Sequence, residues 1–188
     1  MLIKRLFDLF ACIILLGLLC VPFFLLLLAV KFTSNSPVFY WSTRVGKDNR
    51  HFQMPKFRTM QIGTPEVASH LLQKPADHLT PLGNFLRRTS LDEIPQIWSV
   101  LKGDMSIVGP RPALFNQYDL IELRTAKNVH QLTPGITGWA QVNGRDDLSI
   151  TKKVNFDEEY AKKKSFIFDL KVLCLTFIKI IQRDGIRH

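Results

Sequence analysis

Residues 86–112, LRRTSLDEIPQIWSVLKGDMSIVGPRP, form the stretch around which the rest of the chain is organised. An arginine pair precedes the adjacent carboxylates of Asp92 and Glu93, a short apolar helix is predicted next, and a Gly-Pro-Arg-Pro turn ends the stretch. Carboxylates placed between two sets of guanidinium groups, beside a predicted helix start, suit chemistry on a phosphorylated substrate.

The carboxylate pair also has a purely structural interpretation. Ser90 and Glu93 have the spacing of a capping box, in which Ser90 caps the helix and Glu93 reaches back to its first turn. A helix that begins at Asp92 instead places Pro95 in the first turn, where proline is tolerated. Both carboxylates lie at a helix N-terminus in either case, and spacing alone leaves capping and catalysis open.

The residues that follow predict a short helix and a stiff turn. Gly103 should end the helix, and Arg111 lies between two prolines. A guanidinium held in one direction loses less entropy when it binds a phosphate through two hydrogen bonds. A turn with an incidental arginine is the alternative. The predicted buried stripe at helical spacing is Ile94, Ile97, Trp98 and Leu101.

Length and charge set the class of protein and of partner. The 188 residues suit one domain, and 25 Lys and Arg against 16 Asp and Glu give a net charge of +9. That balance favours nucleic acid, anionic lipid headgroups or phosphorylated metabolites as partners. The cysteines, Cys12, Cys20 and Cys174, lie in apolar runs without metal-ligand spacing and are expected to act as small hydrophobes.

An apolar run without any charged residue extends over residues 9–30. At about 1.5 Å per helical residue, this run is long enough to cross a hydrocarbon core of about 30 Å. It exceeds the apolar part of a secretory signal, and no small-residue cleavage site follows it. We therefore expect a membrane-inserted helix, with Asp8 at the lipid interface.

The manner of insertion depends on Pro22 in the middle of the run. Proline removes a helix hydrogen bond, so a kink is expected there. Lys4 and Arg5 precede the run and Lys31 follows it, so the positive-inside rule asks for both ends on the cytoplasmic side. A helix that bends at Pro22 and returns satisfies this rule. A tilted single span is the alternative.

A β-hairpin is predicted from residues 37–41 and 50–59, which flank the turn-forming residues 46–49. Lys56 and Arg58 alternate on its second arm and should share one face. Residues 61–80 are expected to be irregular, with one short helix near residues 66–73.

The second half of the chain is predicted to be mainly helical. Residues 132–145 are expected to form a glycine-rich loop, in which Trp139 either stacks on a nucleobase or packs in the core. Residues 166–183 are apolar but interrupted by charges, a pattern typical of a helix lying in the membrane interface. Further helices are predicted at residues 81–88, 114–129 and 152–164.

Taken together, KFRTM, SLDEIPQ, LKGDMS, GPRP, PGITGWAQVNGR and the kinked N-terminal segment resemble one family over nearly the whole chain. It is the bacterial sugar transferases, the monotopic phosphoglycosyl transferases, in their minimal single-domain form. The resemblance implies a mainly α fold with a short β-hairpin in a monotopic membrane protein. Residues 1–31 would form a re-entrant membrane helix, and residues 32–188 a cytoplasmic catalytic domain with interfacial amphipathic helices. The expected location is the bacterial inner membrane, on its cytoplasmic face.

The resemblance also implies a reaction that starts surface polysaccharide or glycoconjugate synthesis. A sugar-1-phosphate is transferred from a UDP-sugar to undecaprenyl phosphate, and UMP is released. Asp92 would form an aspartyl-phosphosugar in a ping-pong scheme, and Glu93 would help to bind Mg²⁺. Relatives commonly have serine before the bending proline, where this chain has Val21. The implied substrate-binding residues are Lys56, Arg58, Arg87, Arg111, Gln141, Asn143, Arg145 and Asp169.

Two other classes of function compete with this one. A membrane-anchored nucleic-acid-binding protein is compatible with the net charge, but no recognised nucleic-acid module appears, so nucleic acid is not expected as a partner. A non-catalytic membrane scaffold for glycan-assembly enzymes would not need Asp92, Glu93 and the basic motif positions. Downstream glycosyltransferases are possible partners of the enzyme as well.

Overall fold

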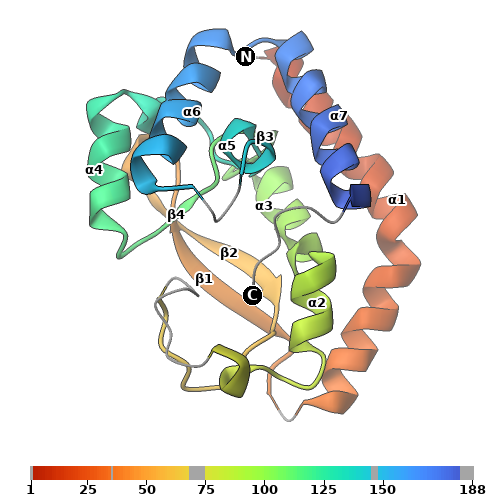
Figure 1. Cartoon of the computed structure of the whole chain (residues 1–188). Helices are drawn as coiled ribbons and strands as arrows, with labels where there is room; N and C mark the ends of the chain where they lie inside the picture. The colour runs from red at the N-terminus through yellow and green to blue at the C-terminus, as the bar shows by residue number, and fades with distance from the viewer. Residues whose placement is uncertain (1, 35, 68–74, 145–147, 183–188) are drawn as a thin grey trace.

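The computed structural model describes residues 2–34, 36–67, 75–144 and 148–182. Helices predominate in this part of the chain, and the strands form two small sheets, as predicted (Figure 1). The α-helices are α1 (Leu2–Thr33), α2 (Gly83–Thr89), α3 (Ile97–Lys102), α4 (Tyr118–Ala126), α5 (Trp139–Val142), α6 (Ile150–Lys163) and α7 (Phe166–Gln182). The strands are β1 (Phe39–Val45), β2 (His51–Phe57), β3 (Ser106–Val108), β4 (Ala113–Leu114) and β5 (Gly135–Thr137). Short 3₁₀ helices are η1 (Lys47–Asn49), η3 (Pro75–His78), η4 (Leu91–Gln96) and η5 (Val129–Gln131).

The predicted hairpin is confirmed, with β1 and β2 as its antiparallel arms. Its register pairs Phe39 with Phe57 at the open end and Val45 with His51 beside the turn. The turn passes through Asp48 at φ 54°, a left-handed backbone that Asp and Asn tolerate better than most residues. Strand β4 pairs with the other edge of β1, and β3 pairs with β5 in parallel in the second sheet.

The predicted membrane segment forms one helix, α1, with Pro22 inside it. Within the described residues, α1 is the one helix long and apolar enough to cross a membrane, by length and composition alone. Most of its side chains are exposed, and only Asp8, Cys12 and Val30 are buried. The apolar surface of α1 is therefore mostly left uncovered by the rest of the protein.

The first turns of α1 are tied to the rest of the molecule by polar contacts. Lys4 Nζ lies 2.5 Å from Asp169 Oδ2 of α7, and Arg5 donates to the carbonyl oxygens of Val100 and Leu101 at the end of α3. Arg5 thereby satisfies carbonyls that a helix C-terminus leaves without partners.

Asp8 is 3% exposed and accepts hydrogen bonds from the Ser106 hydroxyl and the Ile107 amide of β3, at 2.8 and 3.1 Å. The Asp8 side chain therefore faces the protein rather than lipid, and its expected level at the lipid interface stays a prediction. The carboxylate is buried against the protein because β3 supplies the donors that a buried charge requires.

The helix after Asp92 and Glu93 differs from the predicted one. It begins as the 3₁₀ helix η4 and becomes α-helical only in α3, where Gly103 ends it at φ 96° as predicted. Because a 3₁₀ helix has about 3.0 residues per turn, it rotates the side chains that follow away from the predicted stripe. Ile97 is buried, but Trp98 is 56% exposed, so its predicted burial is wrong.

Other predicted elements have different bounds. The helix expected at residues 81–88 begins at Gly83, and the helix expected at 114–129 is reduced to α4. The predicted loop at 132–145 contains β5 and α5 within its described part. Glycine is needed at Gly135 because the backbone of Gly109 approaches closely there. A Cβ on Gly135 would lie 2.1 Å from the Gly109 nitrogen.

Of the helix predicted near residues 66–73, residues 66–67 are not helical and the others lie outside the described residues. The helices predicted at 152–164 and 166–183 are confirmed as α6 and α7. Helix α7 has one buried face, with Val172 at 0% exposure, and exposes Ile167 and Phe177 on its other side. Figure 1 shows α7 beside the first half of α1, with α4 and α6 on the opposite side of the molecule.

Candidate active site

Asp92 and Glu93 lie in the first turn of η4, between α2 and α3. The chain enters η4 through Ser90 in a left-handed conformation, φ 56° and ψ 17°, and the Ser90 side chain makes no capping hydrogen bond. Side-chain capping needs an extended backbone at this position. The capping box is therefore wrong, as is a helix start at Asp92, and Glu93 is left for contacts with other elements.

Glu93 is bound by two cations from distant parts of the chain. Lys56 Nζ of β2 lies 2.8 Å from Glu93 Oε1, and the Arg111 guanidinium donates to both carboxylate oxygens of Glu93. Lys56 Nζ also lies 3.5 Å from Asp92 Oδ2. The fold thus brings four of the predicted site residues into one cluster, in which Lys56 lies between the two carboxylates.

The two carboxyl groups are shifted in opposite directions. Burial raises the pKa of Asp92 above its ordinary value, and the nearby Lys56 offsets only part of this effect. Burial acts on Glu93 in the same sense, but Arg111 and Lys56 outweigh it and hold the pKa of Glu93 well below its usual range. Adjacent carboxyl groups with divergent pKa values are typical of sites that give them different roles.

The carboxylate pair fits Mg²⁺ only as part of a shared site. The described residues contain no group of three or more His, Cys, Asp or Glu side chains that could hold a metal ion. Three N–H donors already occupy Glu93, which leaves about one of its four lone-pair positions. Mg²⁺ commonly takes one or two carboxylates and completes its shell with substrate phosphates and water, so this donor set is compatible with it.

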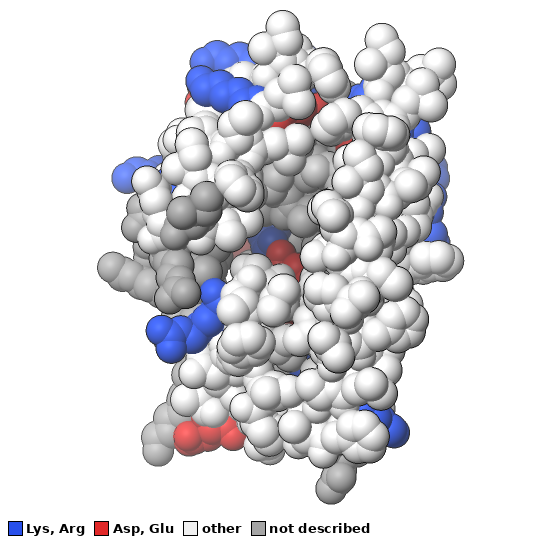
Figure 2. Space-filling view, turned by 90° about the vertical axis from the view of Figure 1, so that its right-hand side faces the viewer, with Lys and Arg blue, Asp and Glu red and all other residues white. Residues whose placement is uncertain are grey.

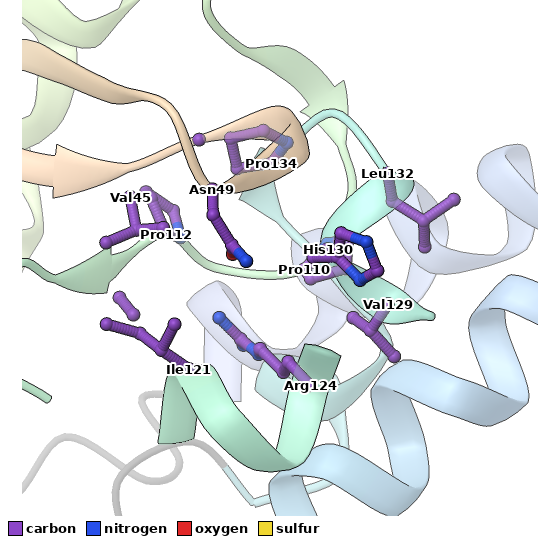
Figure 3. A pocket seen from close by; sticks show the side chains of 12 residues that line it. Val45, Asn49, Pro110, Pro112, Ile121, Arg124, Val129, His130, Leu132 and Pro134 are labelled. Carbon is purple, nitrogen blue, oxygen red and sulfur yellow. The ribbon is translucent and has the colours of Figure 1, made fainter. Parts of the chain in front are cut away.

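Arg111 projects from the predicted Gly-Pro-Arg-Pro turn, which joins β3 to β4. The turn is held against β5, because the Gly109 amide donates to Thr137 O and the Gly135 amide donates to Pro110 O, both at 2.9 Å. Behind the turn lies a cavity of about 30 Å³, whose lining includes Pro110, Pro112 and Arg124 (Figure 3). The stiffness predicted for the Arg111 backbone is supported by these fixed partners.

Arg87 and Arg58 contribute differently. Arg87 lies in the last turn of α2, and its positive charge acts to lower the pKa of Asp92. Arg58 follows β2 and donates to the carbonyl oxygens of Pro37 and Phe39, at 2.9 and 3.2 Å. Its contacts therefore lie at the open end of the hairpin, whereas those of Lys56 lie at the carboxylates.

The predicted site residues in the second half of the chain make other contacts. Gln141 Nε2 donates to Ile136 O, and Asn143 Nδ2 donates to Trp139 O, both at 2.8 Å. Asp169 is buried, pairs with Lys4 and accepts a hydrogen bond from the Tyr160 hydroxyl at 2.7 Å. Arg145 lies outside the described residues.

Trp139 packs against the aromatic rings of Phe156 and Phe168, and its indole nitrogen donates to Glu159. Of its two predicted roles, packing is the one that this arrangement favours.

Two arginines near the cluster were not predicted from the sequence. Arg44 of β1 donates to the Ser42 hydroxyl at 2.9 Å and to Pro112 O at 3.3 Å. Burial, followed by the charge of Arg111, lowers the pKa of Arg44 to about 10. Arg124 of α4 donates to Arg111 O at 2.8 Å. The alternation of Ser42 and Arg44 along β1 was a weak sequence signal for Arg44. No local sequence pattern indicated Arg124.

The face that carries α1 and α7 is strongly apolar. Figure 2 shows it almost entirely white, with most charged side chains at its edges. The centre of this face is hollowed, and Lys or Arg atoms beside Asp or Glu atoms are visible at the bottom of the hollow. Exposed apolar side chains on α1 include Leu18, Val21, Phe24 and Leu25.

The model of one protein family, described as bacterial sugar transferase, matches residues 1–183. The chain belongs to this family. The resemblance predicted from the five motifs is therefore confirmed over almost the full length.

Named relatives of this sugar transferase include an uncharacterized sugar transferase, EpsL, of Bacillus subtilis, which is 43% identical over all of this chain and 92% of its own length. The UDP-glucose:undecaprenyl-phosphate glucose-1-phosphate transferase of Escherichia coli is 42% identical over 95% of this chain. The undecaprenyl-phosphate galactose phosphotransferase of Salmonella typhimurium is 34% identical over 97%. The chain spans 40% and 41% of the lengths of these last two relatives.

Proposed function

We propose that the protein is a phosphoglycosyl transferase that moves a sugar-1-phosphate from a UDP-sugar to undecaprenyl phosphate and releases UMP. The name of the E. coli relative gives a UDP-sugar, undecaprenyl phosphate and the transfer of a sugar-1-phosphate, and the name of the Salmonella relative gives undecaprenyl phosphate and a galactose phosphotransferase. The observation that carries the proposal is the buried Asp92 beside a Glu93 that Lys56 and Arg111 hold in place. Such a step would begin the synthesis of a surface polysaccharide or another glycoconjugate.

In the proposed first half-reaction, an ionised Asp92 oxygen attacks the β-phosphorus of the UDP-sugar. A bond forms from this oxygen to phosphorus, the bond from phosphorus to the bridging oxygen breaks, and UMP leaves. Lys56, Arg87 and Arg111 supply positive charge where the diphosphate is expected to bind. Glu93, together with the substrate phosphates, would hold Mg²⁺, which when bound neutralises diphosphate charge.

In the second half-reaction, a phosphate oxygen of undecaprenyl phosphate attacks the same phosphorus. The bond to Asp92 breaks, the lipid diphosphate sugar is released, and the Asp92 carboxylate is regenerated. The remaining predicted binding residues, Arg58, Gln141, Asn143, Arg145 and Asp169, stay assigned to the substrates or their surroundings as part of this proposal.

We infer a re-entrant membrane helix over residues 1–31 and a cytoplasmic catalytic domain over residues 32–188. Both ends of α1 pack on the same body: Asp8 hydrogen-bonds β3, and Val30 belongs to a core cluster with Phe57 and Leu86. A helix attached to one body at both ends is easier to reconcile with a return to the same membrane face than with a span. With Val21 before the proline, the bend would depend on Pro22 with help from a neighbouring turn.

The lipid acceptor accords with the shape of the apolar face. A membrane surface against α1 and the outer side of α7 would place the charged hollow of Figure 2 next to the headgroups. On this proposal the hollow leads to Asp92, so that a lipid phosphate reaches the carboxylate while its chain stays in the bilayer. The proposed location is the cytoplasmic side of the bacterial inner membrane, where downstream glycosyltransferases would receive the product.

The decisive test separates the two half-reactions. Purified protein incubated with UDP-sugars but no lipid should release up to one equivalent of UMP and gain the mass of a phosphosugar. Asp92→Asn should abolish both signals, because an amide is a poor nucleophile towards phosphorus. The control is Asp104→Asn, because Asp104 pairs with Lys102 and not with the cations of the cluster. Full activity of Asp92→Asn would disprove the mechanism.

A further inference from the structure

The turn that carries Arg111 lacks two of the backbone donors that usually fix a turn, because prolines occupy positions 110 and 112. Its carbonyl groups are fixed instead. Pro110 O accepts from the Gly135 amide, while Arg111 O and Pro112 O each accept from an arginine side chain, Arg124 and Arg44. The donor to Arg111 O is the closer of the two side chains, at 2.8 Å against 3.3 Å.

Arg124 serves two acceptors at once. Its Nη1 donates to Arg111 O, while its Nε and Nη2 donate to Asp157 Oδ2 of α6 at 3.0 and 2.7 Å. In Figure 3 the Arg124 side chain leaves α4 on the side of the segment that holds Pro110 and Pro112. The guanidinium reaches these two acceptors through separate nitrogens, whereas the three N–H groups of a lysine share one nitrogen.

A buried ion pair is a poor means of holding two helices together. Asp157 is 1% exposed, and the desolvation of such a pair offsets most of its attraction, so apolar residues would join α4 and α6 at least as well. The additional hydrogen bond from Arg124 to Arg111 O gives a reason for the presence of this ion pair. It links α6 through Arg124 to the backbone from which Arg111 reaches Glu93.

We propose that Arg124, held by Asp157, is a positioning residue that fixes the direction of the Arg111 guanidinium through the Arg111 carbonyl. This inference rests on the proposed role of Arg111 in binding the diphosphate. Arg124 itself touches neither Asp92 nor Glu93 among the contacts of the described residues. Its effect on the reaction should therefore pass through Arg111.

Arg124→Lys tests this link because the ammonium keeps a charge for Asp157 but lacks the separate donor nitrogens that bind Asp157 and Arg111 O at the same time. We expect the rate of UMP release to fall about tenfold to a hundredfold, as small displacements of catalytic groups commonly cause. Lys127→Gln is the matched control, since Lys127 follows α4 and pairs with Glu158 of α6 without touching the turn. The control should retain the wild-type rate.

A double-mutant cycle distinguishes positioning from a general structural role. In an Arg111→Met background, Arg124→Lys should change the remaining rate by less than about twofold, because the group it positions is absent. An undiminished loss in that background, an equal loss in Lys127→Gln, or full activity of Arg124→Lys would each overturn the inference. If Arg124→Lys unfolds, the charge-free pair Arg124→Met with Asp157→Leu replaces it, with the same expected non-additivity.

A second measurement does not depend on activity. Phenylglyoxal modifies accessible arginines, and the ion pair with Glu93 should slow its reaction at Arg111. Peptide mapping by mass spectrometry should show that Arg124→Lys makes modification of Arg111 several-fold faster, and that Lys127→Gln does not. An unchanged rate would refute the positioning role. If wild-type protein releases no UMP while Arg124→Lys still exposes Arg111, the proposed function fails and the positioning inference stands.

Discussion

At the scale of single residues, the site depends on two neighbouring carboxyl groups with opposite environments. Asp92 is 6% exposed and has one cation at 3.5 Å, so burial dominates and raises its pKa. Glu93 has Lys56 and Arg111 in direct contact, and its pKa is lowered. The proposed nucleophile and a carboxyl group whose pKa is held well below its usual range are therefore adjacent residues of η4.

This difference predicts the acid limb of the pH profile. Only ionised Asp92 can attack, and its raised pKa means that activity should fall, as the pH decreases, at a higher pH than for an ordinary aspartate. Lys56→Met removes a cation that lowers the pKa values of Asp92 and Glu93. The activity that remains in this variant should therefore begin to fall at a still higher pH than in the wild type. Initial rates of UMP release across the acidic range would measure both shifts.

The control for this series is Lys47→Met. Lys47 is exposed at the hairpin turn, away from the carboxylates, so its removal should leave the acid limb in place. An acid limb that stays at the wild-type pH in Lys56→Met would contradict the assignment of Asp92 as the titrating nucleophile.

At the scale of elements, the site is assembled where β2, η4 and the turn after β3 meet. The turn is positioned by the parallel contact between β3 and β5, which brings glycine backbones together. A Cβ on Gly109 would lie 2.4 Å from the carbonyl oxygen of Thr133, far inside contact distance. The close approach of these backbones thus holds Arg111 in front of Glu93.

We therefore expect Gly109→Ala to force β3 and β5 apart. Overpacking of this kind costs about 1–3 kcal/mol, and the displaced turn should also lower the rate of UMP release. The control is Gly17→Ala, the same change in α1 with no atom within 4 Å of the added carbon. Thermal unfolding in detergent should show a lower midpoint for Gly109→Ala and an unchanged or higher one for Gly17→Ala. A wild-type midpoint and rate for Gly109→Ala would show that the close approach is unimportant.

At the scale of the whole molecule, α1 is a helix that is long and apolar enough to meet a membrane, and it is attached to the body that carries the site. Lys4, Arg5 and Asp8 tie its first turns to α7, α3 and β3, and these elements belong to the body that carries Asp92. The opposite end packs near the hairpin through Val30. The apolar surface between these two attachments is exposed and is available to lipid.

This arrangement predicts the topology of the N-terminus. An epitope tag before Met1 should be digested by protease in inside-out vesicles and protected in intact spheroplasts. The contacts of Lys4 and Asp8 require the tag to lie on the same side as the body that carries Asp92, for which we propose the cytoplasmic side. Pro22→Leu should straighten the helix and weaken these contacts, so part of the tag should become accessible from the periplasm. A wild-type tag reached only from the periplasm would rule out the re-entrant helix.

Local signals predicted much of the fold. The apolar run, the hairpin around residues 46–49, the stop at Gly103 and helices α6 and α7 each follow from patterns within a few turns of chain. The cap at Ser90 and the burial of Trp98 were wrong because the backbone is left-handed at Ser90 and η4 is a 3₁₀ helix, whereas the loop at 132–145 was wrong because β5 pairs with the distant β3. Glycine in particular marks a loop in the sequence but serves a backbone contact in β5.

The sequence by itself determined the family, the long apolar helix and the place of the carboxylate pair beside a helix start, because each of these is recorded in consecutive residues. Only the tertiary structure decided what surrounds the pair. Lys56 reaches Glu93 across 37 positions and Arg111 across 18, and Arg124 supports Arg111 from another helix. The opposite pKa shifts of Asp92 and Glu93 arise from burial and from these long-range charges, which no spacing along the chain can specify.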